Sequence, residues 1–318
     1  MKKAVLLLSL SLLLPAALPA QQDRAGDAAQ GGTVPDSVTF PIERVQTPTA
    51  ADLYCAGFIG KPLEKRDRFV AGGLESPFTS RFSNGDAIFL SGSGYQVGQE
   101  YTVIREQRDP NRYEMFRGQW SALKAAGQPY AELARIQITD TRSKMAIARV
   151  EFSCDGVVPG DYIIPFVEKP ATAFHPPVRF DRFGPASGQA RGRILLAKDF
   201  DSELGNGAKV YLNIGDKQGL KVGDYLRVVR SYEVTAHDPV DSLSFTASTT
   251  EPTQIRQAAT DPNLLTRTGG PEVHVAEMPR RAVGEIVIVG TTSTSATGMV
   301  VCSEEPVHIG DQVELEQR

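Results

Sequence analysis

The chain contains one module twice, and this internal repeat constrains the fold more than any other feature. Residues 133–161 (LARIQITDTRSKMAIARVEFSCDGVVPGD) align without a gap with residues 283–311 (VGEIVIVGTTSTSATGMVVCSEEPVHIGD), at a constant offset of 150. An earlier pair also matches, residues 94–105 (GYQVGQEYTVIR) and 219–230 (GLKVGDYLRVVR). The shared positions are apolar runs and Gly-containing turns, so the repeat predicts two copies of one domain.

The repeated segments have the composition of short β-strands. Each is rich in β-branched or aromatic residues and is bounded by Gly, Asp, Asn or Pro, and no long amphipathic helix separates them. We therefore expect an all-β protein with two tandem small β-barrels, SH3-like or similar. The expected strands pair as AIFLSG (87–92) with KVYLNIG (209–215), EYTVIR with YLRVVR, ARIQIT with GEIVIVG, and MAIARVEF with ATGMVVC. We also expect LYCAGFI (53–59) and GRILLA (192–197) to be matching first strands.

The first twenty residues have the pattern of a secretory signal peptide. Lys2 and Lys3 precede an apolar stretch that ends in small residues, which predicts cleavage near Ala20 and a periplasmic or extracellular protein. The stretch is shorter than the roughly twenty residues of a spanning helix, so we expect no integral membrane segment in the mature chain. The net charge of −4 becomes −6 without the two lysines, and the scattered charges exclude a basic footprint for nucleic acid.

The remaining chain divides by composition. Residues 21–51 are polar, without a hydrophobic period, and are predicted to be a flexible tether. The first barrel module is predicted at 52–166 and the second at 191–318. Between them, residues 167–190 carry several prolines and predict a semi-rigid linker, or a strap lying on a barrel surface.

Each module carries an insertion after its VIR or VVR strand. The first, residues 106–132, places Phe116, Trp120 and Leu123 at helical spacing, which predicts one short helix that packs Trp120 onto the barrel. The second is a long loop at 231–281, rich in Thr, Ser, Pro and Asp. Loops of this length are usually functional or disordered.

The three cysteines of the chain predict one disulfide. Cys55 and Cys154 both fall in the first module, and pairing is the default in an oxidising compartment, so we expect them to be joined. Cys302 aligns with Phe152, which predicts a buried and inert position.

No motif in the sequence predicts a catalytic, cofactor or metal site. None of the histidines falls in a zinc-binding spacing, and no GxSxG or GxGxxG pattern occurs. Asp199, Asp201 and Glu203 have the alternation of a calcium loop, but Leu204 replaces its required Gly, and a polar hairpin is the simpler interpretation. We expect no enzyme and no cofactor; an enzyme with a site dispersed along the sequence is the weakest alternative.

Binding through a surface is the remaining class of function. Arginine and aromatic residues dominate interface hot spots, and the first module concentrates both around its insertion. The interface candidates are Arg105, Arg112, Tyr113, Phe116, Arg117 and Trp120. The partner is expected to be another envelope protein; the alternative is peptidoglycan or another cell-wall glycan stacked on these aromatics. Packing in the core is the competing interpretation for the aromatics themselves.

The second module resembles a known family. The segments GAKVYLNIGDKQGLKVGDYLRVVR and VGEIVIVGTTSTSATGMVVCSEEPVHIGDQVEL resemble the C-terminal β-barrel domain of the flagellar assembly protein T family. They are also similar to uncharacterised modules of exported bacterial proteins, some of them attached to LysM domains. The resemblance covers 190–318 well and 84–166 more loosely. It implies a periplasmic, non-enzymatic scaffold in envelope assembly.

Overall fold

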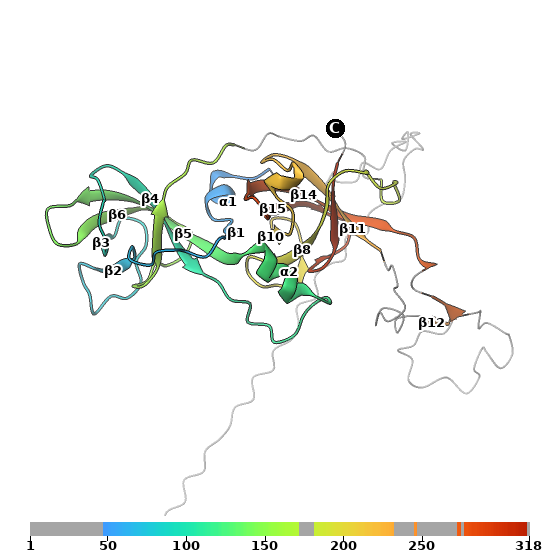
Figure 1. Ribbon diagram of the computed structural model, residues 1–318, viewed down its shortest axis with the longest axis horizontal. Coiled ribbons are helices and arrows are strands. Elements are labelled where there is room, and N and C mark those ends of the chain that lie inside the picture. The colour runs from blue at the N-terminus through green and yellow to red at the C-terminus, as the bar shows by residue number, and fades with distance from the viewer. Residues whose placement is uncertain (1–46, 172–180, 232–244, 247–271, 275–276, 317–318) are drawn as a thin grey trace, which may run out of the picture. The chain divides into compact units, whose positions relative to one another are not determined.

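The computed structural model describes residues 47–171, 181–231, 245–246, 272–274 and 277–316, and Figure 1 shows their arrangement. The predicted signal peptide lies outside these residues, as do most of the predicted tether and most of the loop at 231–281. Within the described part of the chain, no helix combines the length and the apolar character needed to cross a membrane.

The first module is an antiparallel sheet that curls on itself. Its strands lie in the order β2-β3-β6-β5-β4-β7. The two edges of the sheet meet where Phe69, the residue before β2, forms an isolated bridge with Tyr162 of β7. The strands are β2 (Val70–Gly73), β3 (Ala87–Leu90), β4 (Glu100–Glu106), β5 (Gln128–Asp140), β6 (Ala146–Ser153) and β7 (Tyr162–Pro165).

The second module is a closed barrel with the same strand order. It runs β10-β15-β14-β11-β17-β8, and β8 pairs with both β10 and β17, which closes the barrel. The strands are β8 (Arg191–Ala197), β10 (Lys209–Leu212), β11 (Tyr225–Arg230), β14 (Arg281–Thr291), β15 (Ala296–Ser303) and β17 (Gln312–Leu315). The prediction of an all-β fold with barrel modules is confirmed.

Three smaller features lie among the described residues of the second half of the chain. Strand β9 (Glu203–Leu204) pairs with β16 (Val307–His308), so the segment that resembles a calcium loop leads into a short strand pair. Strand β12 (Phe245–Thr246) pairs with β13 (Glu272–Val273). A single 3₁₀ turn, η1, spans Asp216–Gln218.

The two modules match down to the register of their longest strand pairs. Ile136 faces Val150 between β5 and β6, and Ile286 faces Val300 between β14 and β15, again at an offset of 150. Each pair also has two register shifts at equivalent positions. The sequence repeat is therefore a repeat of backbone geometry.

An arginine pairs with the aspartate of the final Gly-Asp turn in both modules. Nε and Nη2 of Arg105 donate to the carboxylate of Asp161 at 2.7 and 2.8 Å, and those of Arg230 donate to Asp311 at 3.0 and 2.7 Å. Both aspartates are buried. Each guanidinium also donates to the carbonyl oxygen five residues before its aspartate. Charge-assisted bidentate bonds of this kind fix the turn to the strand.

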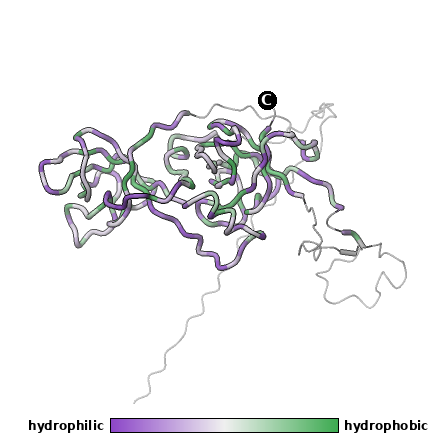
Figure 2. The backbone as a smooth tube through the Cα atoms, viewed as in Figure 1, coloured by the Kyte–Doolittle hydropathy of each residue, from purple (hydrophilic) through white to green (hydrophobic). Residues whose placement is uncertain are grey.

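The modules differ in which faces of their strands are covered. In β6, buried residues alternate with more exposed ones, whereas its counterpart β15 is buried at six consecutive positions and the neighbouring β14 at eight. Figure 2 shows the hydropathy of each residue along the backbone. The outer face of the second barrel is covered by residues of the first module, including Leu53, Ala56, Ile59 and Ala126. A strand that is covered on both faces needs a continuous apolar run, which is what GEIVIVG supplies.

The expectation that LYCAGFI is a first strand matching GRILLA was wrong. Residues 50–54 form a short helix, α1 (Ala50–Tyr54), whose N-terminus is capped by Thr49 and Asp52 in a capping box. Strand β1 (Phe58–Gly60) follows and pairs with β5. The counterpart of β8 is β2, because Val70 and Ile194 each exchange backbone hydrogen bonds with the Gly-Asp turn of their own module.

The described part of the linker contacts the second barrel. The backbone N–H of Ala282 donates to the carbonyl of Arg182, and the Arg182 guanidinium pairs with Glu305. Phe183, in contrast, is largely exposed. Residues 181–190 thus lie against the barrel as a strap does, while Phe174 and Phe180 lie outside the described residues.

Candidate functional site

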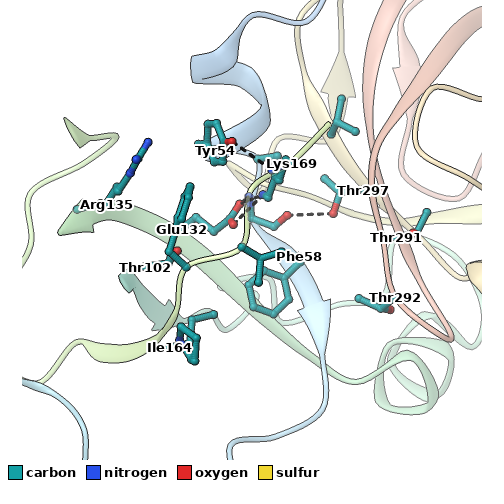
Figure 3. A pocket seen from close by; sticks show the side chains of 18 of the residues that line it. Tyr54, Phe58, Thr102, Glu132, Arg135, Ile164, Lys169, Thr291, Thr292 and Thr297 are labelled. Carbon is teal, nitrogen blue, oxygen red and sulfur yellow. Dashed lines mark hydrogen bonds and ion pairs between the residues drawn. The ribbon is translucent and has the colours of Figure 1, made fainter. Parts of the chain in front are cut away.

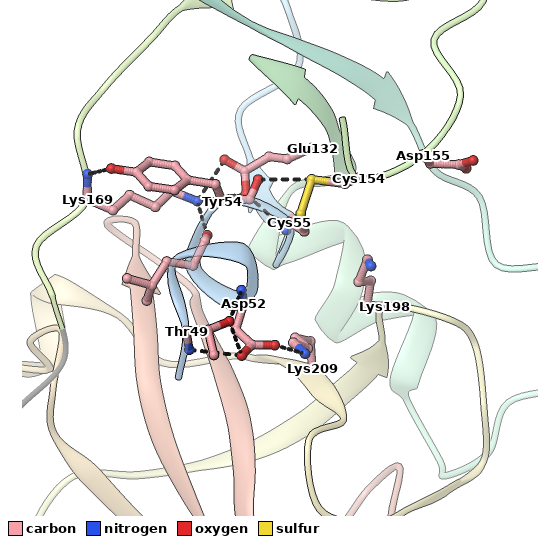
Figure 4. Close-up of a disulfide and its surroundings, with 12 residues drawn as sticks. Thr49, Asp52, Tyr54, Cys55, Glu132, Cys154, Asp155, Lys169, Lys198 and Lys209 are labelled. Carbon is pink, nitrogen blue, oxygen red and sulfur yellow. Dashed lines mark hydrogen bonds and ion pairs between the residues drawn. A yellow bond between two sulfur atoms is a disulfide. The ribbon is translucent and has the colours of Figure 1, made fainter. Parts of the chain in front are cut away.

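Residues 49–60, the bridging segment, connect the two modules. The predicted disulfide between Cys55 and Cys154 is present, with 5.6 Å between the Cα atoms, and joins the segment to the first module (Figure 4). On the other side, the Asp52 carboxylate pairs with Lys209 of β10 at 2.5 Å. Further bonds to the second barrel come from side-chain hydroxyls. Tyr211 donates to the carbonyl of Ala56 at 3.2 Å, Thr297 to that of Gly57 at 2.9 Å, and Ser295 to that of Ile59 at 2.8 Å.

A buried ion pair lies beside the bridging segment. Nζ of Lys169 donates to both carboxylate oxygens of Glu132 at 2.7 Å and to the carbonyl of Leu53 at 2.8 Å. The Glu132 carboxylate also accepts the backbone N–H of Gly57 at 3.1 Å. Burial raises the pKa of Glu132, and the Lys169 ammonium opposes this shift. We assign the ionised state to Glu132, because two donors engage its carboxylate and one of them is a cation.

A cavity of about 230 Å³ opens at this junction. Figure 3 shows Tyr54, Phe58, Glu132 and Lys169 on one side and the threonines of the β14–β15 hairpin on the other. Most of its lining is apolar, with residues contributed by the bridging segment, by both modules and by the start of the linker. The lining residues used below are Ala56, Phe58, Ala134, Ile164, Phe166 and Thr291.

The first insertion forms the predicted helix, and the helix packs on the second barrel. Helix α2 spans Gln119–Ala126. The buried amide of Gln119 donates to the carbonyl of Leu195 in β8 at 2.8 Å, and Thr294 donates to the carbonyl of Ala126 at 3.0 Å. Phe116 packs against the barrel core, and the Arg193 guanidinium lies 4.9 Å from the centre of its ring. These contacts hold the insertion of one module on the surface of the other.

The expectation that Trp120 packs onto the barrel was wrong. Trp120 is 50% exposed, because the side of α2 that faces the barrel carries Gln119, Leu123 and Ala126. The N-terminus of the helix is stabilised by the Glu114 carboxylate, which accepts the backbone N–H groups of Gly118 and Trp120 at 3.0 Å. Trp120 therefore lies on the solvent side of a helix whose position is fixed.

Four of the predicted interface residues lie exposed in the insertion. Tyr113 and Trp120 are 82% and 50% exposed, and Arg112 and Arg117 are exposed as well. Met115, at 43% exposure, adds an apolar side chain that the sequence did not single out. We call Arg112, Tyr113, Met115, Arg117 and Trp120 the insertion surface.

The other two candidates have structural contacts. Phe116 anchors the insertion, and Arg105 is engaged with the buried Asp161 in the strand-to-turn contact that both modules share. Neither belongs to the insertion surface. Cys302 is half-buried and is not part of the disulfide, so the expectation of a fully buried position was wrong.

Among the described residues, no group of three or more His, Cys, Asp or Glu side chains is placed to hold a metal ion. No protein-family model matches the chain, and no curated protein matches it.

The sequence reasoning missed Glu132 and Lys169. One signal was present for Glu132, which is the only charged residue within the apolar run PYAELA that opens a long strand. A charge in such a run is expected to have a buried partner. Nothing local identified the partner, since Lys169 lies 37 residues later in the linker.

Proposed function

We propose that this chain is an exported, non-catalytic scaffold of the bacterial cell envelope that binds another protein through its insertion surface. The observation that carries the proposal is the combination of exposed Tyr113, Met115 and Trp120 with two arginines on an insertion held by Gln119 and Phe116. A surface whose backbone is already ordered loses less entropy on binding than a free loop. The disulfide supports export, because disulfides persist in oxidising compartments.

Affinity capture with matched variants tests this function. Immobilised residues 21–318 are incubated with an envelope extract of the source organism, and the retained proteins are compared between wild type, Tyr113→Ser/Trp120→Ser and Phe78→Ser. Phe78 is 94% exposed on the loop between β2 and β3, so it controls for the loss of an exposed aromatic elsewhere. We expect a specific protein to be retained by wild type and Phe78→Ser and lost from the double variant. Equal retention by all three would contradict the assignment of the surface.

Cell-wall glycan is the second candidate ligand, favoured by the exposed rings of Tyr113 and Trp120. Aromatic rings accessible on one face are the groups on which sugars stack. Co-sedimentation with protein-free sacculi separates the two candidates. Sedimentation of wild type, with loss in Trp120→Ser, would replace the protein partner with the glycan.

A further inference from the structure

The cavity at the junction combines an apolar lining with charges that are already neutralised. Lys169 directs its ammonium to Glu132 and to the carbonyl of Leu53, so its three N–H groups have acceptors. On the other wall, Nη2 of Arg135 lies 2.6 Å from both carboxylate oxygens of Glu100. The Arg135 guanidinium also stacks 4.4 Å from the ring centre of Phe166. Each cation of the wall therefore faces its own carboxylate, and among the described residues the buried Nε of Arg135 is left without a hydrogen-bond partner.

This pairing determines the charge of a suitable ligand. A charged group entering the cavity would lose hydration and find its opposite charges already engaged, which is unfavourable in an apolar environment. A neutral group loses little hydration and gains contact with Ala56, Phe58, Ala134 and Ile164. The lining therefore selects against carboxylates and ammonium groups alike.

The volume of the cavity also limits the size of the group that can bind. Pockets for drug-sized ligands have volumes of about 300 to 1,000 Å³, and this cavity, at about 230 Å³, is smaller. It suits one branched or aromatic side chain with a short polar group beside it. Thr102 and Thr291 line the cavity, and a threonine hydroxyl can donate to or accept from such a group.

We propose that this cavity is a binding site for a neutral apolar group of the size of one amino-acid side chain, carried by an uncharged amide. The same chemistry occurs in an apolar residue within a peptide and in a free small molecule. Because the walls come from both modules and from the bridging segment, an occupant contacts all three and stabilises their junction. The site is separate from the insertion surface and does not depend on it.

Three blocked leucine derivatives test the charge selection on the disulfide-bonded protein, residues 21–318. N-acetyl-leucinamide is neutral, N-acetyl-leucine carries a carboxylate, and leucinamide carries an ammonium group. We expect N-acetyl-leucinamide to give saturable amide chemical-shift changes at Ala134 and Thr291, to raise the melting temperature, and to bind at least tenfold more tightly than the charged compounds. Equal affinities for the three, or the absence of saturation with the neutral compound, would overturn the proposal.

A longer probe distinguishes the two sources of the ligand. Acetyl-Gly-Leu-Gly-amide presents the same side chain within a peptide backbone. Tighter binding of this peptide than of N-acetyl-leucinamide would identify a peptide segment as the ligand, and weaker binding would identify a free small molecule.

Two substitutions locate the site. Thr291→Phe places a ring at the half-buried edge of the cavity, and Ala134→Val reduces the volume from its buried wall. Whichever variant keeps the wild-type circular dichroism spectrum is expected to lose at least tenfold in affinity for N-acetyl-leucinamide. Ser80→Phe, which adds a ring at an exposed position of the first module, is expected to bind as wild type does.

Unchanged binding in the folded cavity variants would refute the location. Tyr113→Ser/Trp120→Ser is expected to bind the probe normally, so failure of the insertion surface as a partner site and failure of the cavity as a ligand site are distinguishable.

Discussion

Replacing Gly310 with Ala tests whether the insertion of the first module is anchored on the second barrel. Gly310 has a φ of +99°, and a Cβ atom added there would lie 2.9 Å from Cδ1 and 3.1 Å from Cβ of Phe116. Gly160 is the equivalent residue of the first module, with a φ of +98° and nothing within 4 Å of an added Cβ. The repeat thus supplies two glycines with the same backbone conformation, only one of which contacts the insertion.

The expected destabilisation has two contributions, the left-handed backbone conformation and the contact with Phe116. A side chain in a left-handed conformation costs about 1 kcal/mol, and this cost is common to Gly160→Ala and Gly310→Ala. Gly310→Ala adds the displacement of Phe116, and overpacking of this kind costs about 1 to 3 kcal/mol. Phe116 is only half-buried and can shift, so the low end applies. We expect losses in the free energy of unfolding of about 1 kcal/mol for Gly160→Ala and about 2 kcal/mol for Gly310→Ala.

Two measurements check this difference. Urea unfolding followed by circular dichroism gives the free energies, and the emission of Trp120, the only tryptophan of the chain, reports on the insertion. We expect Gly310→Ala to change the emission of the native protein and Gly160→Ala to leave it unchanged. In a double-mutant cycle, Phe116→Ala should remove the excess cost of Gly310→Ala. Equal costs for the two glycines, or an excess that persists in Phe116→Ala, would refute the anchoring role of Phe116.

Three further predictions concern covalent and charged contacts. The Cys55–Cys154 disulfide spans a sequence separation of 99, so its reduction should lower the free energy of unfolding by up to about 4.7 kcal/mol. Urea titration with and without reductant measures this loss. A Cys55→Ser/Cys154→Ser variant should not respond to reductant. Glu132→Gln leaves the Lys169 ammonium without its anion and should cost about 3 kcal/mol, part of which Lys169→Met should restore in the double variant. Burial and a neighbouring carboxyl raise the pKa of Glu285 to about 8, so between pH 5 and 8 the folded protein keeps a proton that the unfolded chain has released. The free energy of unfolding should therefore fall as the pH rises from 5 to 8. Glu285→Gln should make this pH dependence weaker.

The repeat made the scaffold predictable. Four of the five expected pairs of strand segments form strands in both modules, because alternating or continuous β-branched residues and Gly-Asp turns act locally. The disulfide was predictable for a similar reason, since Cys55 and Cys154 were the two cysteines of one module. The helix of the insertion followed from its spacing, although the face it buries did not.

The junction could not be predicted, because its contacts join segments far apart in the sequence. Nothing in the sequence distinguishes Gln119 from other polar residues, yet its side-chain amide donates to the carbonyl of Leu195, 76 residues away. Trp120 was expected to pack on the barrel because it lies at helical spacing from Phe116 and Leu123. Only the position of the second barrel decides which side of α2 is covered. LYCAGFI was misread for the same reason: it begins in a short helix and covers a neighbouring barrel, and only Phe58 and Ile59 at its end belong to a strand.

The differences between the two modules explain how they form one unit. Without the bridging segment and the insertion, the second barrel would expose the outer side chains of β14 and β15, which include Val287, Val289, Met299 and Val301. Exposed apolar surface of this extent favours association or aggregation. The first module carries both covering segments, while the alternating pattern of its own β6 leaves an outer face that tolerates water. The second barrel therefore depends on the first more than the first depends on it.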